Sequence, residues 1–232
     1  MTTTFNPAQP GSNPEAARLQ SVDLTGPAGR LEAILNLGAP NPPFAALVCH
    51  PNPLAGGTMH NKVVYHAMKV LNDPEWGFGF PVLRFNFRGT GLSQGVYDGR
   101  AEAEDVRAAL GWLENGYKCP VVVAGFSFGS AMALAACCSQ PQRIRAVVAL
   151  GLPTTADGHN YHYRFLPGCS IPKLFLSGDN DLFAPSAQLA EVVDSAAEPK
   201  SLVLLPGADH FFTGQLELMQ QALAGWLKEQ LK

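Results

Sequence analysis

Short apolar runs alternate with longer segments of helical period along most of this 232-residue chain, and the alternation restricts its fold more than any other feature. The later runs, such as VVVAGF and IRAVVAL, are continuously apolar, which is typical of strands buried on both faces. The first two runs alternate apolar and polar residues, as strands at an antiparallel edge do. The pattern predicts an α/β fold in which helices flank a mostly parallel sheet that begins with a hairpin.

Turn-forming residues separate these elements and set their expected limits. The predicted strands are Leu19–Leu24, Leu31–Leu37, Ala45–His50, Pro81–Phe87, Val121–Phe126, Ala146–Leu150, Lys173–Ser177 and Ser201–Leu205. The predicted helices are Asn61–Leu71, Ala101–Glu114, Gly129–Ser139, Ser186–Ala196 and Phe212–Lys232. Because ligands in such sheets bind beyond the carboxyl ends of the strands, chemically active residues are expected immediately after them.

The chain is expected to form one domain. A chain of this length buries roughly 70% of the surface that it exposes when unfolded, so its core needs no disulfide or metal for stability. No internal repeat or linker interrupts the alternation. Residues 1–17 are polar and rich in Pro and Asn, which predicts a flexible tail, and residues 18–232 are predicted to form a single α/β domain.

The charge distribution and the N-terminal sequence limit which partners and which cellular compartment are expected. The 16 Lys and Arg against 19 Asp and Glu give a net charge of −3 without a basic stripe, so nucleic acid is not expected as a partner. Residues 1–20 lack the basic start and apolar core of a signal peptide, and no apolar run is long enough to span a membrane. A soluble, cytoplasmic protein is expected, and no oligomeric state is predicted.

The cysteines support the same expectation. There are five, Cys49, Cys119, Cys137, Cys138 and Cys169, which is an odd number without C-x-x-C spacing. Four of the five lie in or beside apolar runs. This distribution favours reduced, mostly buried thiols over a disulfide framework.

The most specific motif is Gly125-Phe-Ser127-Phe-Gly129, which directly follows a predicted strand and precedes a predicted helix. This G-x-S-x-G pattern is the nucleophile elbow, in which small residues two positions before and after the serine leave room for a strained turn. The alternative is a glycine-rich turn whose serine only caps the helix. The strand–turn–helix context favours Ser127 as a nucleophile.

A serine nucleophile needs a base and an acid, which follow it in the order acid then histidine in this kind of fold. His210 lies between the last strand and the last helix, so it is the expected base. Asp181 is the expected acid, because Asp179 lies nearer its strand and suits a role in bracing the turn. Asp157, in the preceding loop, is the alternative acid.

Two backbone N–H groups should stabilise an oxyanion. One is that of Phe128, the residue after the nucleophile. The other is expected in the loop after the third strand, where Asn52 and Leu54 are the candidates because the prolines beside them have no N–H. The alternative is a stiff connecting loop without a chemical role. His50 precedes Ser127 in the chain and is expected to orient this loop.

Two other segments are predicted to hold no cofactor and no metal. Arg88-Gly-Thr-Gly91 resembles half of a dinucleotide fingerprint, but it opens a loop and lacks the acidic residue of that motif, so a structural turn is expected. His159 and His162 could face one side of a loop, but no third ligand has suitable spacing.

Four segments together resemble a known family. These are GFSFGS, HPNPLAGGTMHNKVV, RFNFRGTGLSQG and AEAEDVRAALGWL, and they are similar to the small, cap-less serine hydrolases of the α/β-hydrolase superfamily, in particular to a bacterial group with an M-H/D-N-K-V-V run. The resemblance implies an eight-stranded sheet whose second strand is antiparallel, and hydrolysis through an acyl-enzyme intermediate. Many relatives read H-P-H-P where this chain has Asn52 at the third position.

The connection from Leu150 to Pro172 is too short for a multi-helix lid, so an open site is expected. His159, Tyr161 and Phe183 are the candidate substrate-binding residues, since aromatic side chains commonly line small-molecule pockets. The leading hypothesis is a serine hydrolase that cleaves a small-molecule carboxylic ester. A thioesterase or peptidase with the same residues, and a non-catalytic binding protein that keeps the fold, are the alternatives.

Overall fold

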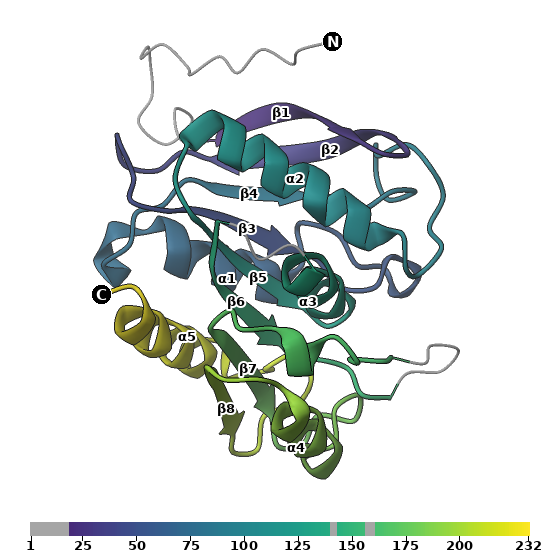
Figure 1. The fold of residues 1–232 in the computed structure, drawn as a ribbon, viewed down its shortest axis with the longest axis vertical. Helices are drawn as coiled ribbons and strands as arrows, with labels where there is room; N and C mark the ends of the chain where they lie inside the picture. Colours follow the sequence, from purple (N-terminus) through teal and green to yellow (C-terminus); the bar gives the residue numbers. More distant parts are fainter. Residues whose placement is uncertain (1–18, 140–142, 156–160) are drawn as a thin grey trace.

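The computed structural model describes residues 19–139, 143–155 and 161–232 (Figure 1). The predicted tail at residues 1–17 and the candidate residues Asp157 and His159 lie outside the described residues.

Eight strands form one sheet, as predicted. They are β1 (Leu19–Gly26), β2 (Gly29–Asn36), β3 (Ala45–Cys49), β4 (Val82–Phe85), β5 (Val121–Phe126), β6 (Ile144–Leu150), β7 (Lys173–Gly178) and β8 (Lys200–Leu205). Their order across the sheet is β1-β2-β4-β3-β5-β6-β7-β8. The β2 strand pairs antiparallel with both neighbours, and the pairings from β4 through β8 are parallel. The α/β fold expected from the alternation is therefore confirmed.

Helices cover both faces of this sheet (Figure 1). They are α1 (Lys62–Asn72), α2 (Glu102–Tyr117), α3 (Phe128–Ser139), α4 (Ser186–Ser195) and α5 (Leu216–Gln230). The α2, α3 and α4 helices pack in one apolar cluster, while α1 and α5 pack in another. Alternate residues of each central strand join opposite clusters, because successive side chains of a strand point to opposite faces. This two-sided burial explains the continuous apolar runs of the sequence.

The last helix starts later than the sequence pattern predicts, at Leu216 rather than at Phe212. The Asp209 carboxylate accepts hydrogen bonds from the N–H groups of Phe211 and Thr213, at 3.0 and 2.9 Å. Phe212 has a φ of 53°, which a helix does not allow. The residues before α5 therefore form a structured turn at the end of the sheet where His210 lies.

The cysteine prediction is wrong in one respect. Cys138 and Cys169 form a disulfide with their Cα atoms 5.0 Å apart, whereas Cys49, Cys119 and Cys137 are free. The end of α3 and the chain before β7 meet in space although they lie 31 residues apart in sequence, and spacing alone does not reveal such a meeting. Because two of the five cysteines are oxidised, the cysteines do not indicate an intracellular compartment.

The connection between β6 and β7 contains, in its described part, only the short 3-10 helix η4 (Leu166–Gly168). No large cap covers the sheet there, as expected. In the ranges that the structure describes, no helix has the length and apolar character needed to cross a bilayer.

Candidate active site

The turn between β5 and α3 holds Ser127 in a strained conformation. Its φ is 52°, in the left-handed region that non-glycine residues rarely adopt. A Cβ atom on Gly125 would lie 2.4 Å from the Gly129 carbonyl oxygen, and a Cβ atom on Gly129 would lie 2.4 Å from the His50 carbonyl oxygen. Only glycine fits at these two positions. The G-x-S-x-G pattern therefore has a steric cause, and the turn presents Ser127 above the carboxyl end of the sheet.

Three side chains from separate loops meet at this turn. The Ser127 hydroxyl lies 3.0 Å from His210 Nε2, and His210 Nδ1 lies 2.8 Å from Asp181 Oδ2. Because the carboxylate accepts, Nδ1 carries the proton and Nε2 is left to accept one from Ser127. In the folded state the imidazole is therefore placed to act as a base toward the serine.

The Asp181 carboxylate is buried and fully engaged. Its Oδ2 also accepts from the Ser177 hydroxyl at 3.0 Å, while Oδ1 accepts from the N–H groups of Phe183 and Ala184 at 2.8 and 3.1 Å. These bonds satisfy the charged oxygens inside the protein and hold the carboxylate toward His210.

Asp179, the other candidate acid, binds the backbone of a neighbouring turn. It is exposed, and its Oδ1 accepts a hydrogen bond of 2.6 Å from the Gly207 N–H. That bond ties the turn after β7 to the turn after β8. The structure thus brings Asp181, and not Asp179, against His210.

The two candidate oxyanion donors in the loop after β3 differ in whether their N–H groups already have a hydrogen-bond partner. The Leu54 N–H donates to the Asn52 side chain at 2.9 Å, and Leu54 itself is 74% exposed. The Asn52 side chain thereby caps the short 3-10 helix η2 (Pro53–Ala55). Because the Leu54 N–H already has a partner, the backbone N–H of Asn52 is the better placed donor. Phe128 opens α3, and a first-turn N–H has no partner within its helix.

His50 fixes the direction of that Asn52 N–H. The imidazole is fully buried: its Nε2 accepts from the Phe87 N–H at 2.9 Å, so Nδ1 is protonated and donates to the Pro51 carbonyl at 2.7 Å. In a planar trans peptide the carbonyl and the next N–H point in opposite directions, so the Asn52 N–H points away from His50. Burial lowers the pKa of His50 from 6.5 to about 4, in keeping with a neutral, orienting ring.

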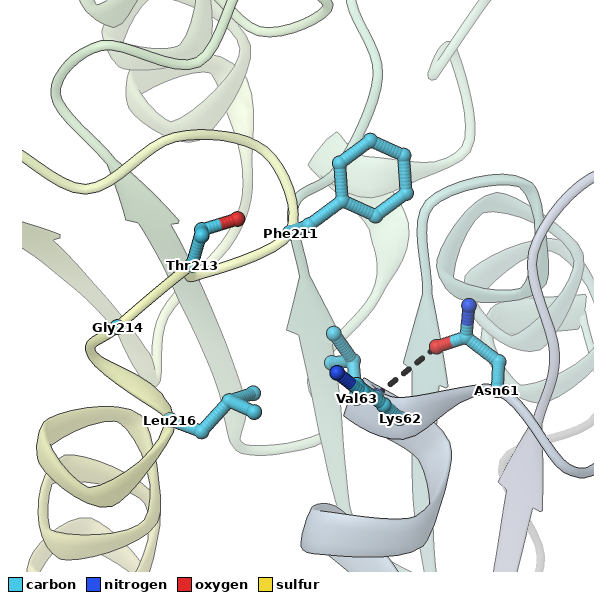
Figure 2. A pocket seen from close by; sticks show the side chains of 7 residues that line it. All are labelled: Asn61, Lys62, Val63, Phe211, Thr213, Gly214 and Leu216. Carbon is cyan, nitrogen blue, oxygen red and sulfur yellow. Dashed lines mark hydrogen bonds between the residues drawn. The ribbon is translucent and has the colours of Figure 1, made fainter.

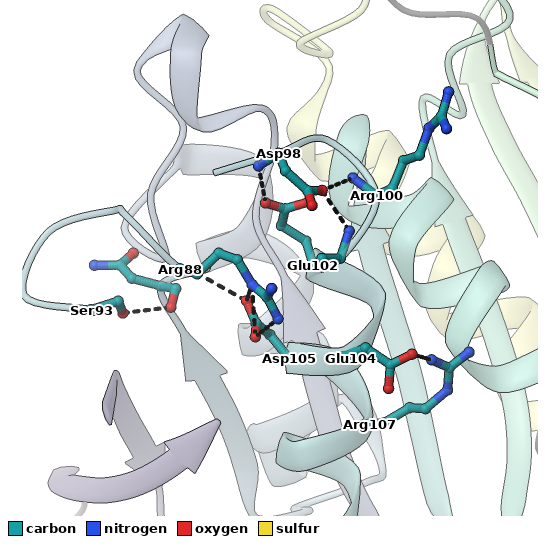
Figure 3. A network of polar contacts seen from close by, with 10 residues as sticks. Arg88, Ser93, Asp98, Arg100, Glu102, Glu104, Asp105 and Arg107 are labelled. Carbon is teal, nitrogen blue, oxygen red and sulfur yellow. Dashed lines mark hydrogen bonds and ion pairs between the residues drawn. The ribbon is translucent and has the colours of Figure 1, made fainter. Parts of the chain in front are cut away.

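The loop after β4 is anchored by a buried ion pair (Figure 3). The Arg88 guanidinium and backbone N–H both donate to the Asp105 carboxylate of α2, with the closest contact at 2.6 Å. The Ser93 hydroxyl donates to the Asn86 carbonyl at 2.6 Å. Arg88 directly follows Phe87, which bonds to His50. The ion pair therefore holds the segment that supports the loop after β3 through His50.

Comparison with known proteins identifies the family to which these features belong. A family model described as "Alpha/beta hydrolase domain" matches residues 55–223. The chain belongs to the α/β-hydrolase family. An uncharacterized protein of Rickettsia prowazekii, RP471, is 37% identical to this hydrolase over 218 residues, which cover 90% of this chain and 89% of the relative.

Solved structures of similar proteins share the fold of this α/β hydrolase. XC6422 from Xanthomonas campestris, described as an α/β serine hydrolase without a lid, has a TM-score of 0.80 at 29% identity and covers 97% of both chains. An α/β serine hydrolase homologue from Coxiella burnetii has a TM-score of 0.79 at 32% identity, covering 90% of this chain and 97% of that one.

Aromatic side chains surround the imidazole of the hydrolase. The ring centroid of Phe183, a predicted substrate residue, lies 4.6 Å from that of His210, and the side chain of Phe183 is 43% exposed. The ring centroid of Phe211 lies 5.1 Å from that of His210 in an edge-to-face arrangement, and Phe211 is 52% exposed. Tyr161, another predicted residue, stacks on Tyr163 at 6.2 Å and packs against the core. The structure thus places Phe183 in contact with His210.

Sequence reasoning missed Phe211, although its position directly after His210 in PGADHFF was a usable signal. The MHNKVV run served there only to indicate the family, but three of its residues, Asn61, Lys62 and Val63, line a cavity together with Phe211. Among the described residues, no group of three or more His, Cys, Asp or Glu is arranged to hold a metal ion.

Proposed function

We propose that this α/β hydrolase is a serine esterase, which cleaves the carboxylic ester of a small or medium acyl substrate through an acyl-enzyme intermediate. One observation carries the proposal: Ser127, held in a strained elbow, lies within hydrogen-bond reach of His210, which is itself bonded to Asp181. This is the arrangement that turns a weak hydroxyl nucleophile into a reactive one.

In the first half-reaction, Ser127 Oγ attacks the ester carbonyl carbon while its proton passes to His210 Nε2. Asp181 stabilises the imidazolium that forms. The carbonyl oxygen, now an oxyanion, accepts hydrogen bonds from the backbone N–H groups of Phe128 and Asn52. The tetrahedral intermediate then collapses, and the alcohol leaves with the proton from His210.

In the second half-reaction, water replaces the alcohol. His210 takes a proton from the water as its oxygen attacks the acyl carbon of the ester on Ser127. The same two N–H groups stabilise the second oxyanion. Collapse returns the proton to Ser127 and releases the carboxylic acid, so the enzyme regains its starting state.

Two features support a site without a large lid. The described part of the β6–β7 connection holds only one short 3-10 helix. The similar Xanthomonas protein is described as a serine hydrolase without a lid. Thioesters and peptide amides suit the same residues, so they form the alternative substrates of the proposed mechanism.

The test is the Ser127→Ala variant, assayed with 4-nitrophenyl acetate and butyrate. We expect kcat/KM to fall by at least about a thousandfold, because the variant keeps substrate binding and the oxyanion donors but has no nucleophile. Ser195→Ala, which changes an exposed serine at the end of α4, is the matched control and should keep its activity.

Covalent labelling with a fluorophosphonate probe gives an independent measurement. The wild-type enzyme and Ser195→Ala should be labelled, and Ser127→Ala should not. Undiminished hydrolysis by Ser127→Ala would exclude the mechanism, and an unlabelled wild-type protein would favour the binding-protein alternative. A panel of matched oxygen esters, thioesters and peptide amides then separates an esterase from a thioesterase or peptidase.

A further inference from the structure

A cavity of about 340 Å³ lies between the start of α1 and the loop that joins β8 to α5 (Figure 2). Its apolar walls come from Val63, Phe211 and Leu216. Its polar lining includes Asn61, Lys62 and Thr213. A volume of this size lies at the lower end of the range for small-molecule sites.

The cavity adjoins the proposed catalytic residues through one shared wall. The Phe211 ring that lines it lies 5.1 Å from the His210 ring and 5.9 Å from the ring of Phe126, the residue before Ser127. Phe211 is 52% exposed, so part of its side chain is accessible to a bound molecule. A substrate held at Ser127 could therefore extend across Phe211 into the cavity.

The cavity has the electrostatics of an anion site. Lys62 has no acidic partner within 4 Å among the described residues, and no acidic side chain lines the cavity. The first turn of α1 also lacks acidic residues, so the positive end of the helix dipole adds to the field of the ammonium group.

The other polar groups near the cavity are also compatible with an anion. Asn61 Oδ1 accepts the Val63 N–H at 2.9 Å, which leaves the amide NH₂ of Asn61 as a donor (Figure 2). The facing loop between β8 and α5 contains one carboxylate, that of Asp209, whose Oδ1 accepts the N–H groups of Phe211 and Thr213. That carboxylate is used to hold its own loop.

We propose that this cavity is a substrate subsite that binds a carboxylate, with Lys62 as the counter-ion and the amide of Asn61 as a second donor. The inference rests on the proposed esterase function and names its substrate class: esters whose acyl or alcohol half ends in a carboxylate. The apolar walls contact the hydrocarbon spacer between the ester and the carboxylate. A single cation matches the single charge of a carboxylate better than the near-double charge of a phosphate.

The experiment compares acidic and neutral esters of matched length. In the acyl arm, the 4-nitrophenyl monoester of glutaric acid is compared with 4-nitrophenyl valerate. In the alcohol arm, 4-acetoxybutyrate is compared with butyl acetate by following acid release. The measured quantity in each arm is the ratio of kcat/KM for the acidic ester to that for the neutral ester.

Lys62→Gln should lower this ratio about two- to fivefold in at least one arm, since a solvent-accessible ion pair is worth up to roughly that factor. Lys62→Glu should lower it further, through repulsion. Salt should reduce the wild-type ratio, because it screens the ion pair. Lys62 is exposed, so both variants should keep the fold, which a thermal melt checks.

Lys69→Gln is the matched control. It removes the same charge from an exposed position two turns further along α1, where the side chain lines a different groove, and it should leave the ratio unchanged. Equal ratios for wild type and both Lys62 variants in both arms would overturn the subsite. If all of these esters resist hydrolysis, the proposed esterase function fails instead, so the two failures are distinguishable.

Discussion

Two carboxylates two residues apart, Asp179 and Asp181, have opposite surroundings in this hydrolase. Asp181 is buried and bonded to His210, whereas Asp179 is exposed and bonded to the backbone of Gly207. A buried acceptor that faces an imidazole fixes its tautomer and stabilises its protonated form. An exposed carboxylate that accepts from a turn N–H contributes to local rigidity alone.

This difference gives a paired prediction. Asp181→Asn should lower kcat by about four orders of magnitude, because an amide in this position favours the wrong tautomer of His210. Asp179→Asn should keep most of the activity, since its side-chain oxygen can still accept from Gly207. Steady-state kinetics with 4-nitrophenyl butyrate measures both. A similar loss in the two variants would reject the assignment of Asp181 as the acid.

At the scale of elements, the β5–α3 turn depends on two chain segments that approach closely. The missing side chain of Gly129 lets the start of α3 lie against the backbone of Cys49 and His50, at the end of β3. The proposed oxyanion donors, Asn52 and Phe128, come from these same two segments. Their separation is therefore set by the contact that only glycine allows.

Gly129→Ala should disrupt this contact. Its Cβ atom would lie 2.4 and 2.6 Å from the carbonyl oxygens of His50 and Cys49, so backbone must move. We expect the free energy of unfolding to fall by roughly 1–3 kcal/mol or more, with a loss of the proposed esterase activity in the protein that folds. Denaturant unfolding and kinetics measure the two effects.

Gly111→Ala is the control for the same chemical change. Gly111 lies inside α2, and a Cβ atom there would meet no atom within 4 Å. Replacing it should raise the free energy of unfolding by about 0.5–1 kcal/mol, because alanine loses less conformational entropy in a helix. A destabilised Gly111→Ala, or an unaffected Gly129→Ala, would contradict the steric explanation.

At the scale of the whole molecule, the carboxyl edge of the sheet works as one connected unit. The buried ring of His50 joins the end of β3 to Phe87, the second residue after β4, and the Arg88–Asp105 ion pair joins the next residue to α2. Protonation of His50 at Nε2 would place an N–H against the Phe87 N–H and break the first of these links. The stability of the fold and the shape of the oxyanion loop therefore depend on the same neutral imidazole.

Stability should fall as the pH drops from 6.5 to about 4. The pKa of His50 is lower in the folded protein than in the unfolded chain, so the unfolded chain binds the proton more tightly in this window. The His50 contribution is fully present above pH 6.5, and about 3 kcal/mol is lost by pH 4. Asp98 and Asp209, whose pKa values are lowered by backbone hydrogen bonds, lose their contributions only below this window.

Urea unfolding across this pH range measures the effect. His50→Gln does not titrate, so its unfolding free energy should be lower at pH 7 but should change less between pH 6.5 and pH 4. Identical slopes for the wild type and this variant would show that another group controls acid stability.

Local chemistry determined most of the architecture. Side-chain period sets which face of a strand or helix is buried, and a nucleophile elbow needs only a strand, two glycines and a helix in succession. All eight predicted strands and all five predicted helices are present for that reason, with shifts confined to their ends. The chain order of Ser127, Asp181 and His210 was likewise readable from residues that follow strands.

Tertiary structure decided how distant loops share their hydrogen bonds. The bond of Asp179 to Gly207, the bond of Asp181 to His210 and the pairing of Cys138 with Cys169 all depend on side-chain directions in segments that meet only after folding. The cavity between Lys62 and Phe211 also depends on tertiary structure, since the residues that line it lie far apart in sequence. The periodicity of the sequence does not predict these contacts between distant loops. They form only when the helices pack against the sheet and bring the loops together.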